Sequence, residues 1–162
     1  MLRIIGSSSS LACGIVKNKI AISVWRGKPS MPDFDIQYGA INQVVEKNPG
    51  KCAFLSIIEQ TSPRPSKEFE QCATRMFHNF GKRLSAVGYI MEGSDIRRAF
   101  VIAIMTSITV LKSTPQPTQA FTDLHSAEKW FRDHLHLREA ISLFEAIEKV
   151  RSAIQSSSGV MQ

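Results

Sequence analysis

The sequence predicts one α/β domain, in which a mixed and mostly parallel sheet of about five strands carries helices packed against it. Three observations lead to this fold class. Short apolar runs of strand length alternate with longer segments whose apolar residues recur every three or four positions. Elements in this order need crossover connections, which join parallel strands. The length of 162 residues and the 43% hydrophobic content suffice for one core.

An antiparallel hairpin is predicted over residues 11–25 as the first element. In its second half, Ile20, Ile22 and Val24 alternate with small or polar residues at the period of a strand. Asn18 tolerates a left-handed backbone, so residues 17–19 can supply the turn. The hairpin therefore opens the sheet with two strands.

The first helix is predicted over residues 34–45, with Ser30 or Asp33 as its N-cap. The Asn-Pro-Gly sequence at residues 48–50 ends this helix. Residues 52–58 then form a short, nearly continuous apolar run, which is typical of a strand that is covered on both faces.

The same alternation continues in the second half of the chain. Pro63 and Pro65 lack amide donors and keep their loop out of the sheet, and Ser66 is placed to cap the next helix. The further predicted elements are an amphipathic helix to Leu84, a strand over Ala86–Met91, an apolar helix from Ile96 to Lys112, a strand over Thr118–Thr122, a helix capped by Ser126, and an amphipathic helix over residues 137–155.

The ends and the composition limit the class of protein. Residues 1–10 and 156–162 are rich in serine and are predicted to be mobile, which leaves a single domain over residues 11–155. The charge of +6 is dispersed without a basic run, so nucleic acid is not expected as a partner. Three cysteines are too few for a disulfide framework, and the amino terminus lacks a secretory signal, which favours the cytoplasm. Residues 99–111 are too short a run for a membrane span.

The sequence contains no pattern that is typical of an enzyme, a metal site or a cofactor site. His134 and His136 are the only histidines close together, and residues two apart do not share a helix face. The glycines form no phosphate-binding loop. Cys52 and Cys72 lie in apolar segments and are predicted to be core residues. We therefore predict no catalytic residue, metal or cofactor.

Several sequence segments, together with the order of the elements, resemble those of a known superfamily. The segments are AISVWRGKP, CAFLSIIEQTSPRP, AVGYIMEG and AFTDLHSAEKWFRDHL. Between Leu11 and Leu135 the chain resembles the STAS-like superfamily, particularly the bacterial anti-anti-sigma-factor-like and SpoIIAA-like domains. The resemblance implies a STAS-like fold and a non-enzymatic regulatory or scaffolding module that binds a protein partner. The predicted helix after Leu137 lies outside it.

The resemblance also indicates where a regulatory hydroxyl would lie. In the superfamily, a phosphorylated serine or threonine follows the third strand, usually in an Asp-Ser-Ser-Gly-like turn. The corresponding loop here lacks that pattern but contains candidate binding residues Thr61, Ser62, Arg64 and Ser66, of which Ser62 and Ser66 are candidates for phosphorylation. A phosphate there would lie near a helix amino terminus. Alternatively, Ser66 is only an N-cap, and Thr61 and Ser62 are only turn residues.

A second loop is expected at the same edge of the sheet, because it also follows a parallel strand. Its candidate binding residues are Glu92, Ser94, Arg97 and Arg98. Arg97 and Arg98 fall in the first turn of a predicted helix, where they oppose the helix dipole unless an anion or an acidic partner compensates. Alternatively, Asp95 pairs with them on a solvated surface.

Two further features leave alternatives open. Trp25 is an exposed interface anchor if Ile20 and Val24 point inward to the only covered face, or a buried residue if helices cover both faces. The carboxy-terminal helix has an apolar side that could pack back on the domain or pair with a second copy to form a homodimer.

Two other functions stay open beside protein binding. One is binding of a lipid or another apolar small ligand. This function is favoured by the apolar character of residues 96–111 and by the resemblance of the SpoIIAA-like group to domains that bind such ligands. The other is an enzyme whose site follows no familiar motif.

Overall fold

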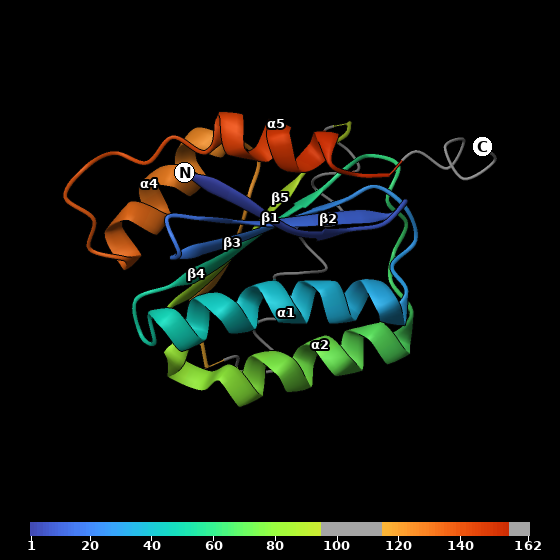
Figure 1. Cartoon of the computed structure of the whole chain (residues 1–162), viewed down its shortest axis with the longest axis horizontal. Helices are drawn as coiled ribbons and strands as arrows, with labels where there is room; N and C mark the ends of the chain where they lie inside the picture. Colours follow the sequence, from blue (N-terminus) through green and yellow to red (C-terminus); the bar gives the residue numbers. More distant parts are fainter. Residues whose placement is uncertain (95–114, 156–162) are drawn as a thin grey trace.

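Six strands form one sheet in the computed structural model, which describes residues 1–94 and 115–155. Helices cover both faces, with α1 and α2 on one side and α4 and α5 on the other (Figure 1). The elements are β1 (Leu2–Ser7), β2 (Leu11–Val16), β3 (Ile20–Trp25), α1 (Met31–Lys47), β4 (Ala53–Ile58), α2 (Lys67–Phe80) with a 3-10 turn (Gly81–Arg83), β5 (Ala86–Met91), β6 (Thr118–Phe121), α4 (Leu124–His134) and α5 (Phe144–Ser152).

The strands lie in the sheet in their chain order, from β1 to β6. β1, β2 and β3 pair antiparallel, whereas β3, β4, β5 and β6 are parallel neighbours. The predicted α/β class with a mixed and mostly parallel sheet is therefore confirmed. The predicted helix from Ile96 to Lys112 lies outside the described residues.

The sheet has one strand more than the predicted number of about five, because β1 was not expected. β1 lies within residues 1–10, which were predicted to be a mobile end, and pairs with the rest of the sheet. A clear period of two is missing from LRIIGS, and β1 is only partly buried. It forms through its antiparallel pairing with β2, and the Asp33 carboxylate accepts a 2.6 Å hydrogen bond from the Ser8 hydroxyl just after it.

The hairpin and the first cap follow the predicted chemistry. Lys17 and Asn18 both have left-handed φ angles, of 53° and 56°, and make the turn between β2 and β3. Both candidate caps of α1 take part in a capping box: the Ser30 side chain accepts from the Asp33 amide, and the Asp33 carboxylate accepts from the Ser30 amide.

Two other boundaries were wrong. α4 is capped by Asp123, whose carboxylate accepts hydrogen bonds from both the amide and the hydroxyl of Ser126 at 2.8 and 2.9 Å, so Ser126 is not the cap. The predicted helix over residues 137–155 is shorter: residues 137–143 are not helical, and α5 spans only Phe144–Ser152. The Leu143 amide donates instead to the Glu128 carboxylate of α4 at 2.5 Å.

Each face of the sheet carries its own apolar core. Side chains of α1 and α2 pack on one face, and side chains of α4 and α5 pack on the other. The apolar side of α5 is therefore occupied, since Ile147, Val150 and Ile154 are all buried against the sheet. Of the two alternatives for the carboxy-terminal helix, packing back on the domain is the one that the structure shows, and this side is not free to form a homodimer.

Candidate functional site at the carboxyl edge of the sheet

Three consecutive parallel strands end at one edge of the sheet, and each is followed directly by a charged residue. These residues are Arg26 after β3, Glu59 after β4 and Glu92 after β5. The backbone pairing extends one step past the strands, because the Glu59 amide donates to the Trp25 carbonyl and the Glu92 amide donates to the Ile58 carbonyl, both at 2.9 Å. The ladder thus sets the three charged side chains in a row.

Arg151 of α5 joins this row from the other layer. Its guanidinium donates to the Glu59 carboxylate and makes a bidentate pair with the Glu92 carboxylate at 2.9 and 3.0 Å. The Arg26 guanidinium contacts the same Glu59 carboxylate at 2.7 and 3.2 Å. We call Arg26, Glu59, Glu92 and Arg151 the carboxyl-edge cluster. It ties the ends of three strands to the helix that covers them.

Opposite charges in the carboxyl-edge cluster shift the pKa values of Glu59 and Arg151. Burial alone would raise the pKa of Glu59, but hydrogen bonds from Arg26 and Arg151 outweigh it and lower the pKa below its ordinary value. The hydrogen bond to Glu92 raises the pKa of Arg151, and the bond to Glu59 adds to it. The lowered pKa keeps the Glu59 carboxylate charged around neutral pH, between the two guanidinium groups.

The predicted loop after β4 lies beside this cluster. Thr61 is exposed, and its hydroxyl donates to the Arg26 carbonyl at 2.9 Å. Ser66 is exposed as the N-cap of α2, where its hydroxyl accepts from the Phe69 amide at 3.2 Å. Arg64 is also exposed and pairs with Glu70 at 3.2 Å. These three residues remain candidates for recognition.

Ser62 differs from its neighbours in this loop. Its side chain is buried, with 6% of its surface exposed, and its hydroxyl donates to the Gly27 carbonyl at 3.1 Å. A kinase could reach this hydroxyl only after the loop had moved and exposed it. Ser62 therefore stabilises the turn in this conformation, and its phosphorylation stays a prediction.

The predicted loop after β5 reaches the same edge through Glu92, which belongs to the carboxyl-edge cluster. Ser94 is exposed. Arg97 and Arg98 lie outside the described residues, so their predicted role stays a prediction.

The proposal of Trp25 as an exposed anchor was wrong. The residue is 5% exposed because α1 and α2 cover the face of the sheet to which it points. Its indole nitrogen donates to the Gln37 side chain at 3.1 Å, and its ring meets Phe69 edge-on at 5.4 Å. Trp25 is therefore a core residue whose indole N–H has a hydrogen-bond partner.

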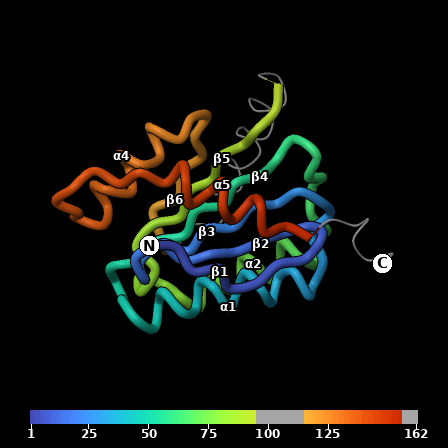
Figure 2. The backbone as a smooth tube through the Cα atoms, turned by 45° about the horizontal axis from the view of Figure 1, so that its top comes forward, coloured from blue at the N-terminus to red at the C-terminus, as the bar shows by residue number. Residues whose placement is uncertain are grey.

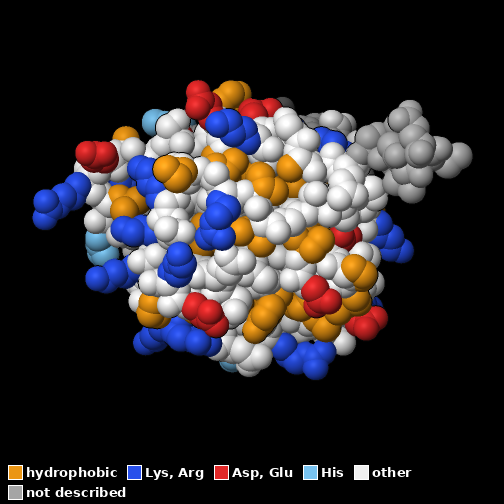
Figure 3. All heavy atoms as spheres, viewed as in Figure 1, with side chains coloured by type: hydrophobic (Ala, Val, Ile, Leu, Met, Phe, Trp, Pro, Cys, Tyr) orange, Lys and Arg blue, Asp and Glu red, His pale blue; other side chains and the backbone are white. Residues whose placement is uncertain are grey.

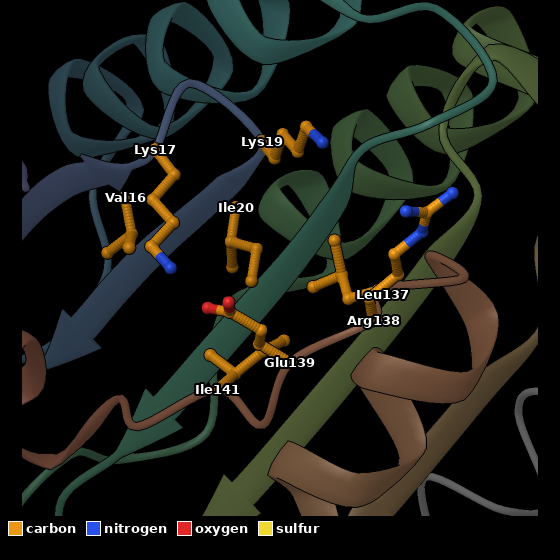
Figure 4. Close-up of a pocket in the computed structure, with 8 residues that line it drawn as sticks. All are labelled: Val16, Lys17, Lys19, Ile20, Leu137, Arg138, Glu139 and Ile141. Carbon is orange, nitrogen blue, oxygen red and sulfur yellow. The ribbon is translucent and has the colours of Figure 1, made fainter.

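Two open pockets flank the layer of α4 and α5. One, of about 340 Å³, borders the carboxyl-edge cluster between β5 and α5, with Ile147 and Phe144 on its apolar side and Glu92 and Arg151 on its polar side. The other, of about 430 Å³, lies at the opposite edge of the sheet, where Leu137 and Ile20 point into it and Lys17 and Arg138 rise from its rim (Figure 4).

Two cysteine thiols are buried in the core. Burial raises the pKa of Cys52 to about 11 and also raises the pKa of Cys13, so both thiols stay protonated. Cys52 is fully buried, as predicted. In residues 1–94 and 115–155, no three His, Cys, Asp or Glu side chains are grouped to hold a metal ion. No helix in this part of the chain has the length and apolar character to cross a membrane.

Sequence reasoning missed most of the carboxyl-edge cluster. Arg26 and Glu59 could have been found, since each is the first charged residue after a predicted parallel strand. Arg151 could not, because it is one of several charged residues on α5, and only the packing of that helix decides which of them faces the strand ends.

Comparison with known proteins supports the fold. No family model matches the sequence, and no curated protein matches it. Among solved structures, the chain is similar to an uncharacterised protein of the DUF3478 family with a SpoIIAA-like fold from Shewanella loihica PV-4. The TM-score is 0.53 at 14% sequence identity, over 75% of this chain and 94% of that one. The chain has a SpoIIAA-like fold. The STAS-like fold that its sequence segments implied is thereby confirmed, and an identity this low bears on the fold alone.

Proposed function

We propose that this SpoIIAA-like domain is a non-enzymatic regulatory or scaffolding module that binds a protein partner at the carboxyl edge of its sheet. The recognition element is the loop over residues 60–66, which the carboxyl-edge cluster adjoins. The supporting observation is that this loop is exposed at its tip and held rigidly at its base.

The base of the loop is anchored to the segment that follows the neighbouring strand β3, and to the end of its own strand β4. The Thr61 and Ser62 hydroxyls donate to consecutive carbonyls, those of Arg26 and Gly27, and the Ser62 amide donates to the Glu59 carbonyl at 3.0 Å. Pro63 and Pro65 restrict the backbone that follows. A loop that already has one conformation loses little entropy when it binds, so it favours association with a partner surface.

The charges at this edge support binding more than catalysis. Every member of the carboxyl-edge cluster is paired with an opposite charge, and the lowered pKa of Glu59 keeps it from acting as an acid or a base near neutral pH. The exposed Arg64 lies at the tip of the loop, where a partner can reach it.

Reversing the charge at the loop tip should abolish partner binding. We expect the wild-type chain to recover a stoichiometric partner by affinity purification from its native cells and R64E to lose it. The reason is that R64E replaces the positive guanidinium in the proposed interface by a negative carboxylate. The matched control is R132E, which makes the same change at an exposed position of α4. Mass spectrometry of the three eluates is the measurement. Equal recovery with R64E and R132E would exclude the loop as the contact, and no partner with the wild type would remove the proposed function.

A second candidate function is binding of a small anionic ligand with an apolar part. It rests on the pocket of about 430 Å³, whose floor is apolar and whose rim carries Lys17, Lys19 and Arg138 against one carboxylate, Glu139 (Figure 4). Such an arrangement complements a carboxylate on a short alkyl chain.

Octanoate should bind this pocket more tightly than octanol does. In a titration followed by amide chemical shifts, we expect saturable changes at Val16 and Ile20 with octanoate, because its carboxylate meets the basic rim. The double substitution K17E and R138E should remove the preference for the acid. Equal shifts with octanol, or shifts spread over the whole surface, would contradict this function.

A further inference from the structure

β1 leaves one edge of the sheet open. It pairs with β2 on one side, and no described element lies beyond it on the other (Figures 1 and 2). An edge strand presents unpaired amides and carbonyls along its outer side, and these groups can pair with another strand.

The layer of α5 stops short of this edge. α5 packs over β2 and β3, where Val150 and Ile147 are buried. Ile4 lies opposite Gly14, and a side chain at Gly14 would point toward Leu2 and Val150, which places Ile4 on the α5 side of the sheet. Because α5 does not reach it, the Ile4 side chain is 44% exposed.

The usual protections of an edge strand are weak in β1. Its sequence, LRIIGS, contains no proline, lysine or acidic residue. Its one charge is turned away, since the Arg3 guanidinium donates to the side chains of Gln43 and Asn18 at 2.9 and 3.3 Å. The only irregularity is a shift of register between Ile4 and Gly6. Figure 3 shows hydrophobic side chains spread across this side of the molecule between basic ones.

We propose that β1 is a homodimer interface, in which a second copy of the chain pairs with it antiparallel about a two-fold axis at Ile4. In this register Ile4 faces its own counterpart and Arg3 faces Ile5, so no like charges lie directly opposite. The two Ile4 side chains cover each other on the side that α5 leaves bare. The two sheets then continue across the axis as one. This interface is separate from the carboxyl edge and does not depend on the proposed function.

Sedimentation velocity over a wide range of concentration tests this interface. We expect the wild-type chain to dimerise and I4K to dimerise about tenfold to a hundredfold more weakly, because the substitution removes an apolar contact and opposes two charges. The matched control is Y38K: Tyr38 is 43% exposed on α1, away from the edge, and its substitution should leave the dimer intact. Circular dichroism verifies that both variants are folded.

A charge-pairing experiment tests the register itself. I4K and I4E should each sediment as monomers when alone and form a dimer when mixed, because the two-fold axis brings position 4 of one copy against position 4 of the other. A wild-type chain that is monomeric at every concentration would overturn the proposal. So would a dimer that I4K leaves unchanged, or variants that are monomeric alone and do not associate when mixed.

Discussion

Replacing Arg151 by methionine is expected to lower the free energy of unfolding by about 2–3 kcal/mol, less than the full value for a buried ion pair because the site is partly open to solvent. Methionine keeps much of the packing volume but removes the guanidinium contacts to Glu59, Glu92 and Glu148. The Glu59 side chain, of which 12% is exposed, would then lose the Arg151 partner and keep its pair with Arg26. Denaturant unfolding measures the difference.

R64M is the matched control for this substitution. Arg64 also pairs with a glutamate, Glu70, but 67% of its side chain is exposed, so its loss should cost less than about 1 kcal/mol. Equal losses for R151M and R64M would show that the carboxyl-edge cluster contributes no more than a surface ion pair does.

The difference in stability between the wild type and R151M should depend on pH. Because the folded pKa of Glu59 is lowered, its contribution to stability is present at neutral pH and is lost as the pH falls through that lowered pKa. In R151M one of the two groups that lower this pKa is gone. The difference in stability between the wild type and R151M should therefore narrow in acid, as Glu59 is protonated in both. A difference that does not depend on pH would indicate lost packing instead of lost charge pairing.

Replacing Gly88 by alanine is expected to destabilise the fold by about 2 kcal/mol through overpacking. A Cβ atom at this position of β5 would lie 2.7 Å from the ring of Phe131 on α4. Phe131 has no exposed surface and is held edge-on by Trp130 at 5.2 Å, so its ring has little room to move. Thermal and denaturant unfolding give the change.

Two further variants isolate the cause. G39A places the same methyl group on α1, where nothing lies within 4 Å of it, and should stabilise the protein by about 0.5–1 kcal/mol through the lower entropy of the unfolded chain. F131L combined with G88A should cost less than the sum of the two single changes, since a smaller side chain relieves the contact. Additive losses would show that the two residues do not compete for space.

Local patterns were sufficient for most elements of this fold. The turn over residues 17–19, the cap at Ser66 and the strands over Ala53–Ile58 and Ala86–Met91 each depend on residues that are neighbours in sequence. The elements that were misjudged depend on distant partners. β1 forms because its backbone pairs with β2. α5 begins only at Phe144, where the preceding Leu143 amide donates a hydrogen bond to Glu128 of α4.

The candidate site divides in the same way. The alternation of strands and helices alone places the ends of β3, β4 and β5, and hence the loop with Thr61 and the residue Glu92, at one edge. Only the packing of α5 on the sheet decided that Arg151 reaches Glu59 and Glu92, and only the cover of α1 and α2 decided that Trp25 is buried. The physical reason is that periodicity and turn chemistry act within a few residues along the chain. A salt bridge or a covered face instead depends on how separate layers come together.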